Sequence, residues 1–395
     1  MTDQTAARRG YVTDGIHSEL RREGRPVGVT KDDLPTPALL VDLDDLEANL
    51  LKMANHVRSH GKAFRPHAKT HKCPQIARRQ IKAGAIGICV ATVPEAEVMV
   101  ASGIPGVHLT SPIASPHKVE WIMRLAEISP DLMVAIDHPQ QVQLYQAAAK
   151  AAGHTLNVLV DINAGDCRTG VAHGEPALDL ARTVAKCANL RLRGLQSYSG
   201  KSSHVVGFEE REAYSREAMG KSIATRRLLE KHGMAVEILS GGSTGTYDID
   251  CQLDGVTELQ VGSFIFMDLD YRRIGGRDGP QFNDFGHSLT VLTTVVSTNH
   301  ADRVSLDAGI KSFATDRAFG PESKDVRGVT YSLGGDEFGI LTLEDPGRPI
   351  ALGDRLEFLV PHCDPTVNLY ERIYACRQDR VEEVWSIMNR LPAAI

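Results

Sequence analysis

The chain has 395 residues, of which 42% are hydrophobic and 24% charged, values that are ordinary for a globular protein with a sizeable core. Its net charge of −6 argues against a nucleic-acid partner, because nucleic-acid binders usually carry a basic excess. No apolar run approaches the roughly 18 residues of a membrane span, and 1–29 lacks the apolar core of a secretory signal. The seven cysteines are scattered without a CxxC pair, which is typical of reduced thiols. We therefore expect a cytoplasmic protein without a membrane or nucleic-acid partner.

Short apolar segments alternate with helical patterns from about residue 36 to 266. The expected strands are 38–43, 63–68, 86–92, 107–111, 132–137, 156–162, 190–198, 236–240 and 258–266. The expected helices are 73–83, 95–101, 119–128, 140–151, 176–188 and 209–231. The strands are apolar throughout rather than alternating, as expected when both faces of a sheet are covered. This pattern predicts an α/β fold with a parallel sheet.

The expected strands number nine, whereas eight close a TIM (β/α)8 barrel. The simplest solution is that 38–43 lies elsewhere and that the barrel begins at Ala63. An open, doubly wound sheet is the rival architecture, but no GxGxxG motif follows an early strand.

The pattern of expected secondary structure changes after about residue 285. Short β-rich segments separated by turn signals follow at 289–297, 303–307, 328–332, 338–343, 355–359, 371–377 and 381–387. The Gly/Asp-rich segment 275–284 is the expected linker. We therefore predict an N-terminal extension (1–35), a barrel domain (36–275) and a C-terminal β domain (285–395).

The run from Arg65 to Lys72 holds five basic or imidazole side chains in eight residues. A lysine at a strand end that is shielded from water has a lowered pKa and becomes a nucleophile toward carbonyls. The alternative is a solvated basic turn. If the strand continues, Arg65, His67 and Lys69 alternate along it and face the barrel interior.

Two loops at adjacent strand ends are rich in Gly, Ser and Thr, namely 240–245 and 260–263. Backbone N–H groups and hydroxyls of such loops can bind a phosphate. A single loop of this kind is more often a tight turn, but two neighbouring loops opposite a strand-end lysine favour a phosphate-bearing cofactor.

A second cluster, 361–366, follows the apolar segment 356–360. If that strand continues, His362 and Asp364 point to one side and Cys363 to the other. A histidine and an aspartate at this spacing can chelate one metal ion. The alternative is that both side chains cap a turn before Pro365.

Together these motifs resemble one family, the fold-type III pyridoxal-phosphate enzymes of the alanine-racemase-like class. Within it the chain is similar to the group of D-threonine aldolase, D-serine dehydratase and 3-hydroxy-D-aspartate aldolase, and most of all to the D-threonine aldolase-like branch. The resemblance covers about residues 34–390 and rests on the segments 65–69, 240–245, 258–263, 266–268, 307–309 and 362–366. It implies a barrel that starts at the lysine strand, and a first strand that joins the metal-binding β domain.

The resemblance also implies roles for individual residues. Lys69 stands where the family places its Schiff-base lysine, and His67 lies beside it on the cofactor side. Arg168 and Tyr198 stand where groups contact the cofactor ring, and His204 matches a histidine near the substrate hydroxyl. The implied phosphate cradle is Ser243, Thr244, Gly245, Gly262 and Ser263. His362 and Asp364 match the ligands of a divalent metal, Mn²⁺ or Mg²⁺ by their mixed N/O character, with Zn²⁺ or Co²⁺ as alternatives.

The residue at position 364 separates the possible reactions. The dehydratase branch has a His-x-Cys pair, whereas this chain has His362-x-Asp364, which is the aldolase-like arrangement. We expect an aldolase that cleaves a D-3-hydroxy-amino acid to glycine and an aldehyde. Departures at 91–96, 110–113 and 336–339 from the group's pattern concern the substrate pocket.

Three alternatives from other classes stay open. They are a dehydratase acting on D-serine or D-3-hydroxyaspartate, an amino-acid racemase, and a non-catalytic pyridoxal-phosphate-binding protein. The metal pair argues against the racemase, and the β domain argues against the non-catalytic protein. The resemblance also implies a homodimer and a small-molecule D-amino acid as substrate.

Overall fold

The computed structural model describes residues 28–389 and divides the chain into two compact units. The barrel unit contains 49–265 and 270–285. The sheet unit contains 286–387, 266–269 and the segment that ends at Ala48. Residues 1–27 of the expected N-terminal extension lie outside the described residues.

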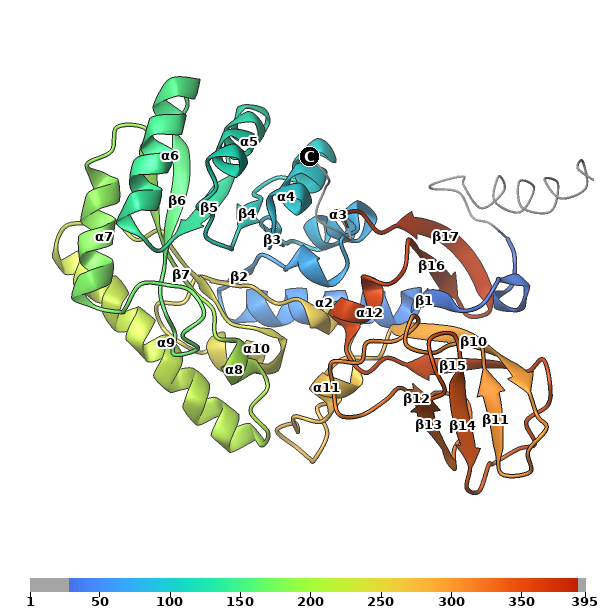
Figure 1. Ribbon diagram of the computed structural model, residues 1–395. Coiled ribbons are helices and arrows are strands. Elements are labelled where there is room, and N and C mark those ends of the chain that lie inside the picture. Colours follow the sequence, from blue (N-terminus) through green and yellow to red (C-terminus); the bar gives the residue numbers. More distant parts are fainter. Residues whose placement is uncertain (1–27, 390–395) are drawn as a thin grey trace, which may run out of the picture. The chain divides into compact units, whose positions relative to one another are not determined.

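A curled sheet of eight parallel strands forms the centre of the barrel unit, in the order β2-β9-β8-β7-β6-β5-β4-β3 (Figure 1). The strands are β2 (Ala63–Phe64), β3 (Cys89–Val90), β4 (His108–Leu109), β5 (Met133–Ile136), β6 (Leu156–Asp161), β7 (Leu190–Ser197), β8 (Ile238–Gly241) and β9 (Glu258–Leu259). A parallel bridge between His67 and Cys89 joins the two ends of this order. The predicted α/β barrel beginning at Ala63 is confirmed.

Helices surround these strands (Figure 1), and the six expected ones are all present. They are α3 (Pro74–Lys82), α4 (Val93–Ala101), α5 (Pro116–Ile128), α6 (Pro139–Ala152), α7 (Glu175–Ala185) and α9 (Phe208–Lys231). The first five carry proline at the first or second helical position, where its missing N–H costs nothing. Proline thus fixes where each helix begins. Two shorter helices, α8 (Gly200–Ser203) and α10 (Tyr247–Asp250), follow β7 and β8.

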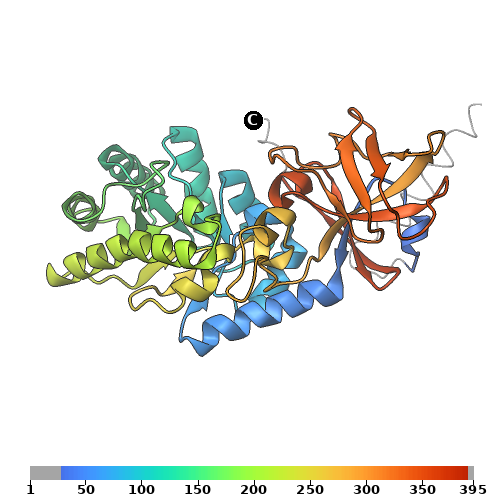
Figure 2. The same cartoon turned by 90° about the horizontal axis from the view of Figure 1, so that it is seen from below.

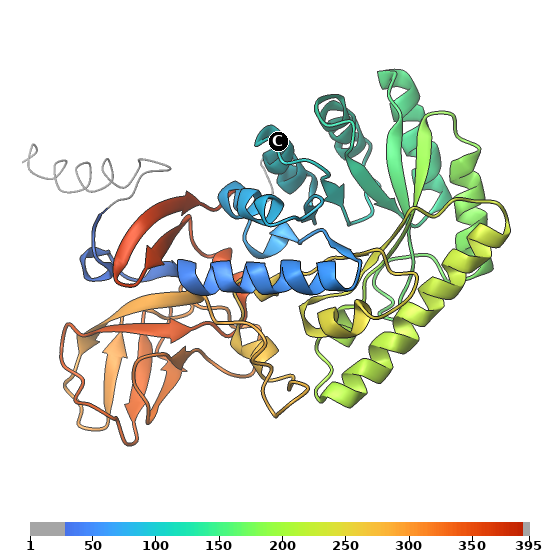
Figure 3. The same cartoon turned by 180° about the vertical axis from the view of Figure 1, so that it is seen from behind.

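The helix α2 (Leu43–Ser59), blue in Figure 3, was not predicted. The Asp42 carboxylate accepts hydrogen bonds from the backbone N–H groups of Asp44 and Asp45, at 2.9 and 3.2 Å, and so caps the helix. The buried residues Leu46, Leu50, Met53 and Val57 recur at spacings of three or four. This periodicity was available in the sequence.

The sheet unit contains one nine-stranded sheet, which is strongly curved in Figure 2. Its strands are β1 (Ala38–Asp42), β10 (Leu289–Ser297), β11 (Arg303–Leu306), β12 (Glu322–Ser323), β13 (Val329–Leu333), β14 (Gly339–Leu343), β15 (Arg355–Leu359), β16 (Arg372–Arg377) and β17 (Arg380–Ser386). β1 pairs with β10 in the antiparallel direction and with β16 in the parallel direction. Two short helices interrupt the sequence of these strands: α11 (Leu269–Arg272) precedes β10, and α12 (Cys363–Val367) lies between β15 and β16.

Four expected strands are much shorter than predicted: 86–92 is a strand only at Cys89–Val90, 107–111 only at His108–Leu109, and two others end in turns. The segment 63–68 is a strand only at Ala63–Phe64, and a 3-10 turn, η2 (Ala68–Thr70), replaces its end. The segment 258–266 is a strand only at Glu258–Leu259 and continues into the turn η4 (Ser263–Ile265). Apolar composition predicts burial, but it does not show where backbone pairing stops.

A buried ion pair joins β9 to the residue that follows β2. Arg65 Nε lies 2.9 Å from Glu258 Oε1 and Arg65 Nη2 lies 3.0 Å from Glu258 Oε2. The two residues are only 4% and 2% exposed. Burial raises the pKa of Glu258, but the adjacent guanidinium overrides this and holds that pKa below its ordinary value.

We expect Glu258→Gln to lower the free energy of unfolding by about 3–5 kcal/mol, because the change leaves a buried guanidinium unpaired. Urea unfolding measures the loss. Glu237→Gln is the matched control: Glu237 is paired with Arg191 and Arg193 on the surface, so its loss should cost about 1 kcal/mol or less. Equal losses in the two variants would contradict the assignment of a buried pair.

All seven cysteines are free thiols, and Cys73, Cys89, Cys251, Cys363 and Cys376 are buried. In the described part of the chain, every helix is too short or too polar to cross a lipid bilayer.

Candidate active site

A cavity of about 260 Å³ lies in the barrel unit, and its wall brings together four of the predicted site residues. These are His67, Lys69, Arg168 and Tyr198. Tyr198 directly follows β7, and Thr110, another wall residue, directly follows β4. The cavity therefore opens at the carboxyl ends of the parallel strands, where barrels gather their chemistry.

Lys69 lies in the turn η2 rather than on a strand, so the expected strand alternation of residues 65, 67 and 69 is wrong. The reason is that His67 caps this turn: its Nδ1 accepts a hydrogen bond from the Lys69 backbone N–H at 3.3 Å. His67 Nε2 therefore carries the proton and donates to Thr110 Oγ1 at 3.1 Å. His67 thus fixes the start of the turn and orients Lys69 at the cavity wall.

Arg168 and Tyr198 lie against each other, with the guanidinium carbon 5.3 Å from the ring centroid. The loop that carries Arg168 is held by Asn163, whose Oδ1 accepts from the backbone N–H groups of Gly165 and Cys167 at 2.9 and 3.1 Å. Gly170 ends this loop at φ +95°, and a Cβ there would lie 2.3 Å from the Asn163 nitrogen. Only glycine therefore allows the loop to close behind Arg168.

The five residues of the predicted phosphate cradle lie in the loops after β8 and β9. Thr244 Oγ1 accepts from the Phe264 backbone N–H at 3.0 Å, which joins the two loops. Ser243, Thr244 and Ser263 are 3%, 1% and 8% exposed. Gly245 lies in the turn η3 (Thr244–Thr246), where its carbonyl accepts from Arg211 Nε at 2.8 Å.

Two observations indicate that this region suits a small oxygen-rich group. A Cβ at Gly262 would lie 2.8 Å from Thr70 Oγ1, so a glycine keeps this approach open. Thr70 Oγ1 is buried and has no hydrogen-bond partner among the described residues. A buried hydroxyl without a partner is costly unless a ligand supplies one.

Buried polar side chains to which the sequence analysis assigned no role hold the cavity wall in place. Gln196 Nε2 donates to the Thr110 carbonyl at 2.8 Å and to Asp161 Oδ1 at 2.9 Å. Gln260 Nε2 donates to Ser240 Oγ at 2.9 Å and to Gln196 Oε1 at 3.3 Å. These side chains are buried, so the network fixes the wall with little access for water. The available signal was a polar residue at the end of an apolar strand.

Burial raises the pKa of Asp161 to about 6, although hydrogen bonds from Gln196 and Thr169 partly oppose this. Between about pH 4 and pH 6 the folded protein holds a proton that the unfolded chain has released, so stability falls as pH rises. Asp161→Asn should remove this loss. The measured quantity is the free energy of unfolding of the variant minus that of wild type, obtained by urea unfolding of the cofactor-free protein. We expect this difference to be more favourable to the variant at about pH 7 than at about pH 4. A difference that is independent of pH would contradict this.

His204 follows the short helix α8 and is not among the residues that line the cavity. Its Nδ1 is 3.1 Å from Asp270 Oδ2, and its ring centroid is 4.8 Å from that of Tyr271. Tyr271 OH in turn lies 2.8 Å from Ser203 Oγ. The neighbouring carboxylate and the aromatic ring restrict the orientation of the imidazole.

His362 and Asp364 lie in the sheet unit, at the start of α12. The expectation that they share one side of a continuing strand is wrong, because the chain turns after Pro361 and His362 becomes the N-cap of α12. Cys363 is buried, and its backbone N–H donates to Asp268 Oδ2 at 2.8 Å. The Cys363 thiol lies 3.4 Å from Asp364 Oδ1, so these two side chains do not point to opposite sides as the strand model predicted.

The His362 ring is oriented by a residue that the sequence analysis missed. Its Nδ1 lies 2.8 Å from Asp316 Oδ2. The carboxylate can only accept, so Nδ1 carries a proton, and in the neutral imidazole Nε2 then keeps its lone pair. A carboxylate behind a histidine is the arrangement that orients metal-ligating histidines. His362 is therefore suited to bind a cation through Nε2.

Comparisons with known proteins identify the family of this chain. Residues 41–270 match the family model described as alanine racemase, N-terminal domain, and residues 288–376 match that of the putative serine dehydratase domain. A D-threonine aldolase of Arthrobacter sp. is 37% identical over 90% of this chain and 92% of its own length. A 3-hydroxy-D-aspartate aldolase of Paracoccus denitrificans is 33% identical over 92% and 94%. The crystal structure of a D-threonine aldolase from Filomicrobium marinum is 37% identical, with a TM-score of 0.87 over 93% of this chain and 99% of the other.

Proposed function

Because the chain belongs to the alanine-racemase-like, fold-type III family of pyridoxal-phosphate enzymes, we propose that it is a metal-dependent aldolase. It would cleave a D-3-hydroxy-amino acid of the D-threonine type to glycine and an aldehyde. The observation that carries this proposal is the cavity that collects Lys69, Arg168 and Tyr198 at the strand ends. The 37% identity to a D-threonine aldolase over 90% of the chain supports the same reaction.

The described residues fit pyridoxal phosphate. Lys69 would hold the cofactor through its amine, Arg168 and Tyr198 would position its ring, and the loops after β8 and β9 would bind its phosphate. The unpartnered Thr70 hydroxyl beside Gly262 supports this last role. The cofactor supplies an electron sink for the bonds at the substrate Cα. The protein decides which bond breaks by how its side chains orient the substrate.

For carbon–carbon cleavage the substrate β-hydroxyl must lose its proton. We assign His204 as the group that takes this proton, because it matches the family's histidine near the substrate hydroxyl and Asp270 lies beside its ring. His362 Nε2 and the Asp364 carboxylate would hold a divalent cation, with Asp316 fixing the histidine tautomer. Nitrogen and oxygen ligands without a thiolate suit Mn²⁺ or Mg²⁺, with Zn²⁺ and Co²⁺ as alternatives. Such an ion supplies Lewis acidity toward a hydroxyl.

The products of three substrates test the reaction. The purified enzyme with Mn²⁺ is incubated with D-threonine, D-serine or D-3-hydroxyaspartate. We expect glycine plus an aldehyde from the substrate that turns over fastest. Ammonia plus a 2-oxo acid would assign the chain to the dehydratases instead, and conversion to the L-amino acid would assign it to the racemases.

We further propose a homodimer, by analogy with the family, and a cytoplasmic location, which the seven free thiols support. Light scattering during size-exclusion chromatography measures the mass. A monomer that retains full activity would exclude the dimer as the active form.

A further inference from the structure

Two histidines and a cysteine converge in the barrel unit, outside the wall of the cavity. One ligand atom of each of His56, His60 and Cys251 lies within 4.8 Å of the others. Among residues 28–389, this is the group of His, Cys, Asp or Glu side chains that lies close enough together to hold a metal ion. His56 and His60 are four residues apart at the end of α2, and Cys251 directly follows α10. Residues four apart on a helix present their side chains on one face.

The hydrogen bonds of His60 define which of its nitrogens is available. Its Nδ1 lies 2.9 Å from the His56 carbonyl oxygen, which can only accept. Nδ1 therefore carries the proton, and Nε2 keeps its lone pair. A backbone carbonyl that accepts from the distal nitrogen is one of the devices that orient metal-ligating histidines.

His56 contributes the second nitrogen. Its Nε2 is buried and has no hydrogen-bond partner among the described residues. Its ring packs edge-on against Tyr247, with the centroids 4.7 Å apart, so its orientation is restricted. Burial, reinforced by His60, lowers the pKa of His56 to about 4, so this imidazole is neutral at physiological pH. A neutral imidazole with an unpartnered nitrogen is able to bind a cation.

Cys251 supplies a sulfur atom from the other side of the group. It is 1% exposed, and burial raises the pKa of its thiol to about 12. A cation that binds here must displace the thiol proton to solvent, and the sulfur lone pair then forms the metal–sulfur bond. No oxidation or reduction accompanies this step.

We propose that His56, His60 and Cys251 form a second metal site, which takes a borderline-soft divalent ion such as Zn²⁺. Two imidazole nitrogens and one thiolate are a ligand set that zinc prefers, and His60 is exposed, so water can complete the tetrahedron. The set differs from His362 and Asp364, whose nitrogen and oxygen atoms suit harder ions. A metal here would tie the end of α2 to α10 within the barrel unit.

Cobalt spectroscopy tests the thiolate directly. The pyridoxal-phosphate-loaded enzyme is freed of metal with a chelator and titrated with Co²⁺, and the spectrum of the metal-free holoenzyme is subtracted. To remove the first metal site, the experiment is also run in Asp364→Asn. We expect a near-ultraviolet band for sulfur-to-cobalt charge transfer in both proteins, and its loss in Cys251→Ser. Absence of the band from wild type, or its survival in Cys251→Ser, would overturn the proposal.

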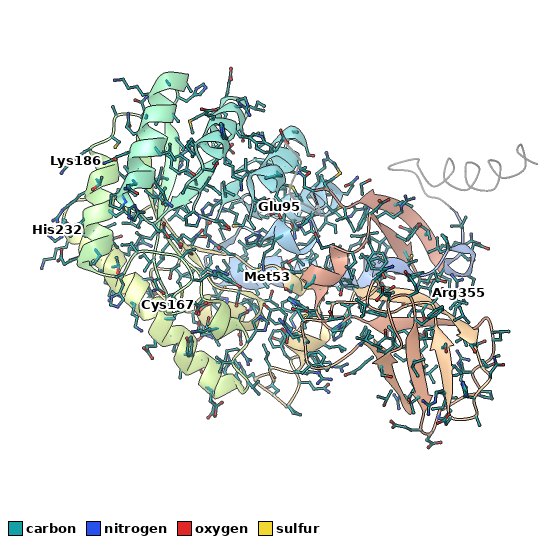
Figure 4. The ribbon with its side chains drawn as sticks, viewed as in Figure 1. Met53, Glu95, Cys167, Lys186, His232 and Arg355 are labelled. Carbon is teal, nitrogen blue, oxygen red and sulfur yellow. The ribbon has the colours of Figure 1, made fainter. Side chains whose placement is uncertain are left out.

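Zinc binding gives a second readout with a matched control. His60→Gln should weaken Zn²⁺ binding at this site by more than about 100-fold, since loss of outer partners alone weakens metal binding 10–100-fold. His232, labelled at the end of α9 in Figure 4, is the control: its Nδ1 lies 3.0 Å from the Leu228 carbonyl in the same local geometry. His232→Gln should leave Zn²⁺ binding unchanged. Equal binding in the two variants would show that the rings only pack together.

Discussion

Lys69→Ala is expected to abolish the visible absorbance of bound pyridoxal phosphate and to lower kcat by about 10⁴-fold or more. The general acid–base part of such a lysine's role alone accounts for about 10²–10⁴-fold in rate. The loss of the anchoring amine adds to this, because the cofactor is then held only by its ring and phosphate contacts. Absorbance and product formation, measured on the same preparation, separate loss of the cofactor from loss of catalysis.

Lys72→Ala is the matched control, because Lys72 lies three residues further along the same basic run. Its Nζ is 3.5 Å from Glu95 Oε1 and 3.4 Å from the Asn389 carbonyl, so it is directed to other partners. We expect this variant to keep the visible band. A band that survives in Lys69→Ala and disappears in Lys72→Ala would transfer the anchoring role to Lys72.

The positions of the barrel strands and helices were predictable because the signals that define them are local. Apolar segments that are covered on both faces, and prolines in the first turn of a helix, can be read from the sequence without knowledge of tertiary contacts. The helix α2 carried a local signal, an apolar stripe, that was overlooked, whereas the turn before Pro365 at the start of α12 was considered as an alternative to the strand. The ends of β2 and β9 carried no such signal, because they depend on how far neighbouring strands stay paired.

The residues of the candidate site also fall into those that the sequence predicts and those that it does not. Lys69, Arg168, Tyr198 and the two metal-site residues stand in motifs that a reader can recognise in the sequence. Asp161, Gln196 and Asp316 do not, since their roles depend on contacts with residues distant in the sequence, as in Asp161–Gln196 and Asp316–His362. Asp316 Oδ2 contacts His362 Nδ1, although the two residues are 46 positions apart in the sequence. Only the fold brings such side chains together, and they orient the groups that the motifs supply.

Asp364→Asn is expected to lower both Mn²⁺ affinity and kcat by more than about 100-fold, since it replaces a charged ligand with a neutral amide of the same shape. Loss of an outer partner alone weakens metal affinity about 10–100-fold, and a direct ligand should exceed that range. Metal titration followed by glycine formation measures both quantities. The visible cofactor band should be unchanged, because Asp364 is not among the residues proposed to hold the cofactor.

Asp316→Asn completes the test, because Asp316 is expected to orient His362 without binding the metal itself. Its replacement should weaken Mn²⁺ affinity by about 10–100-fold, less than the loss in Asp364→Asn. Asp364→Cys should shift the preference from Mn²⁺ toward Zn²⁺, because thiolate is a softer ligand than carboxylate. If all three variants retained wild-type Mn²⁺ affinity, His362 and Asp364 would only cap the α12 turn. The proposal that these two residues bind the metal ion of the aldolase would then be wrong.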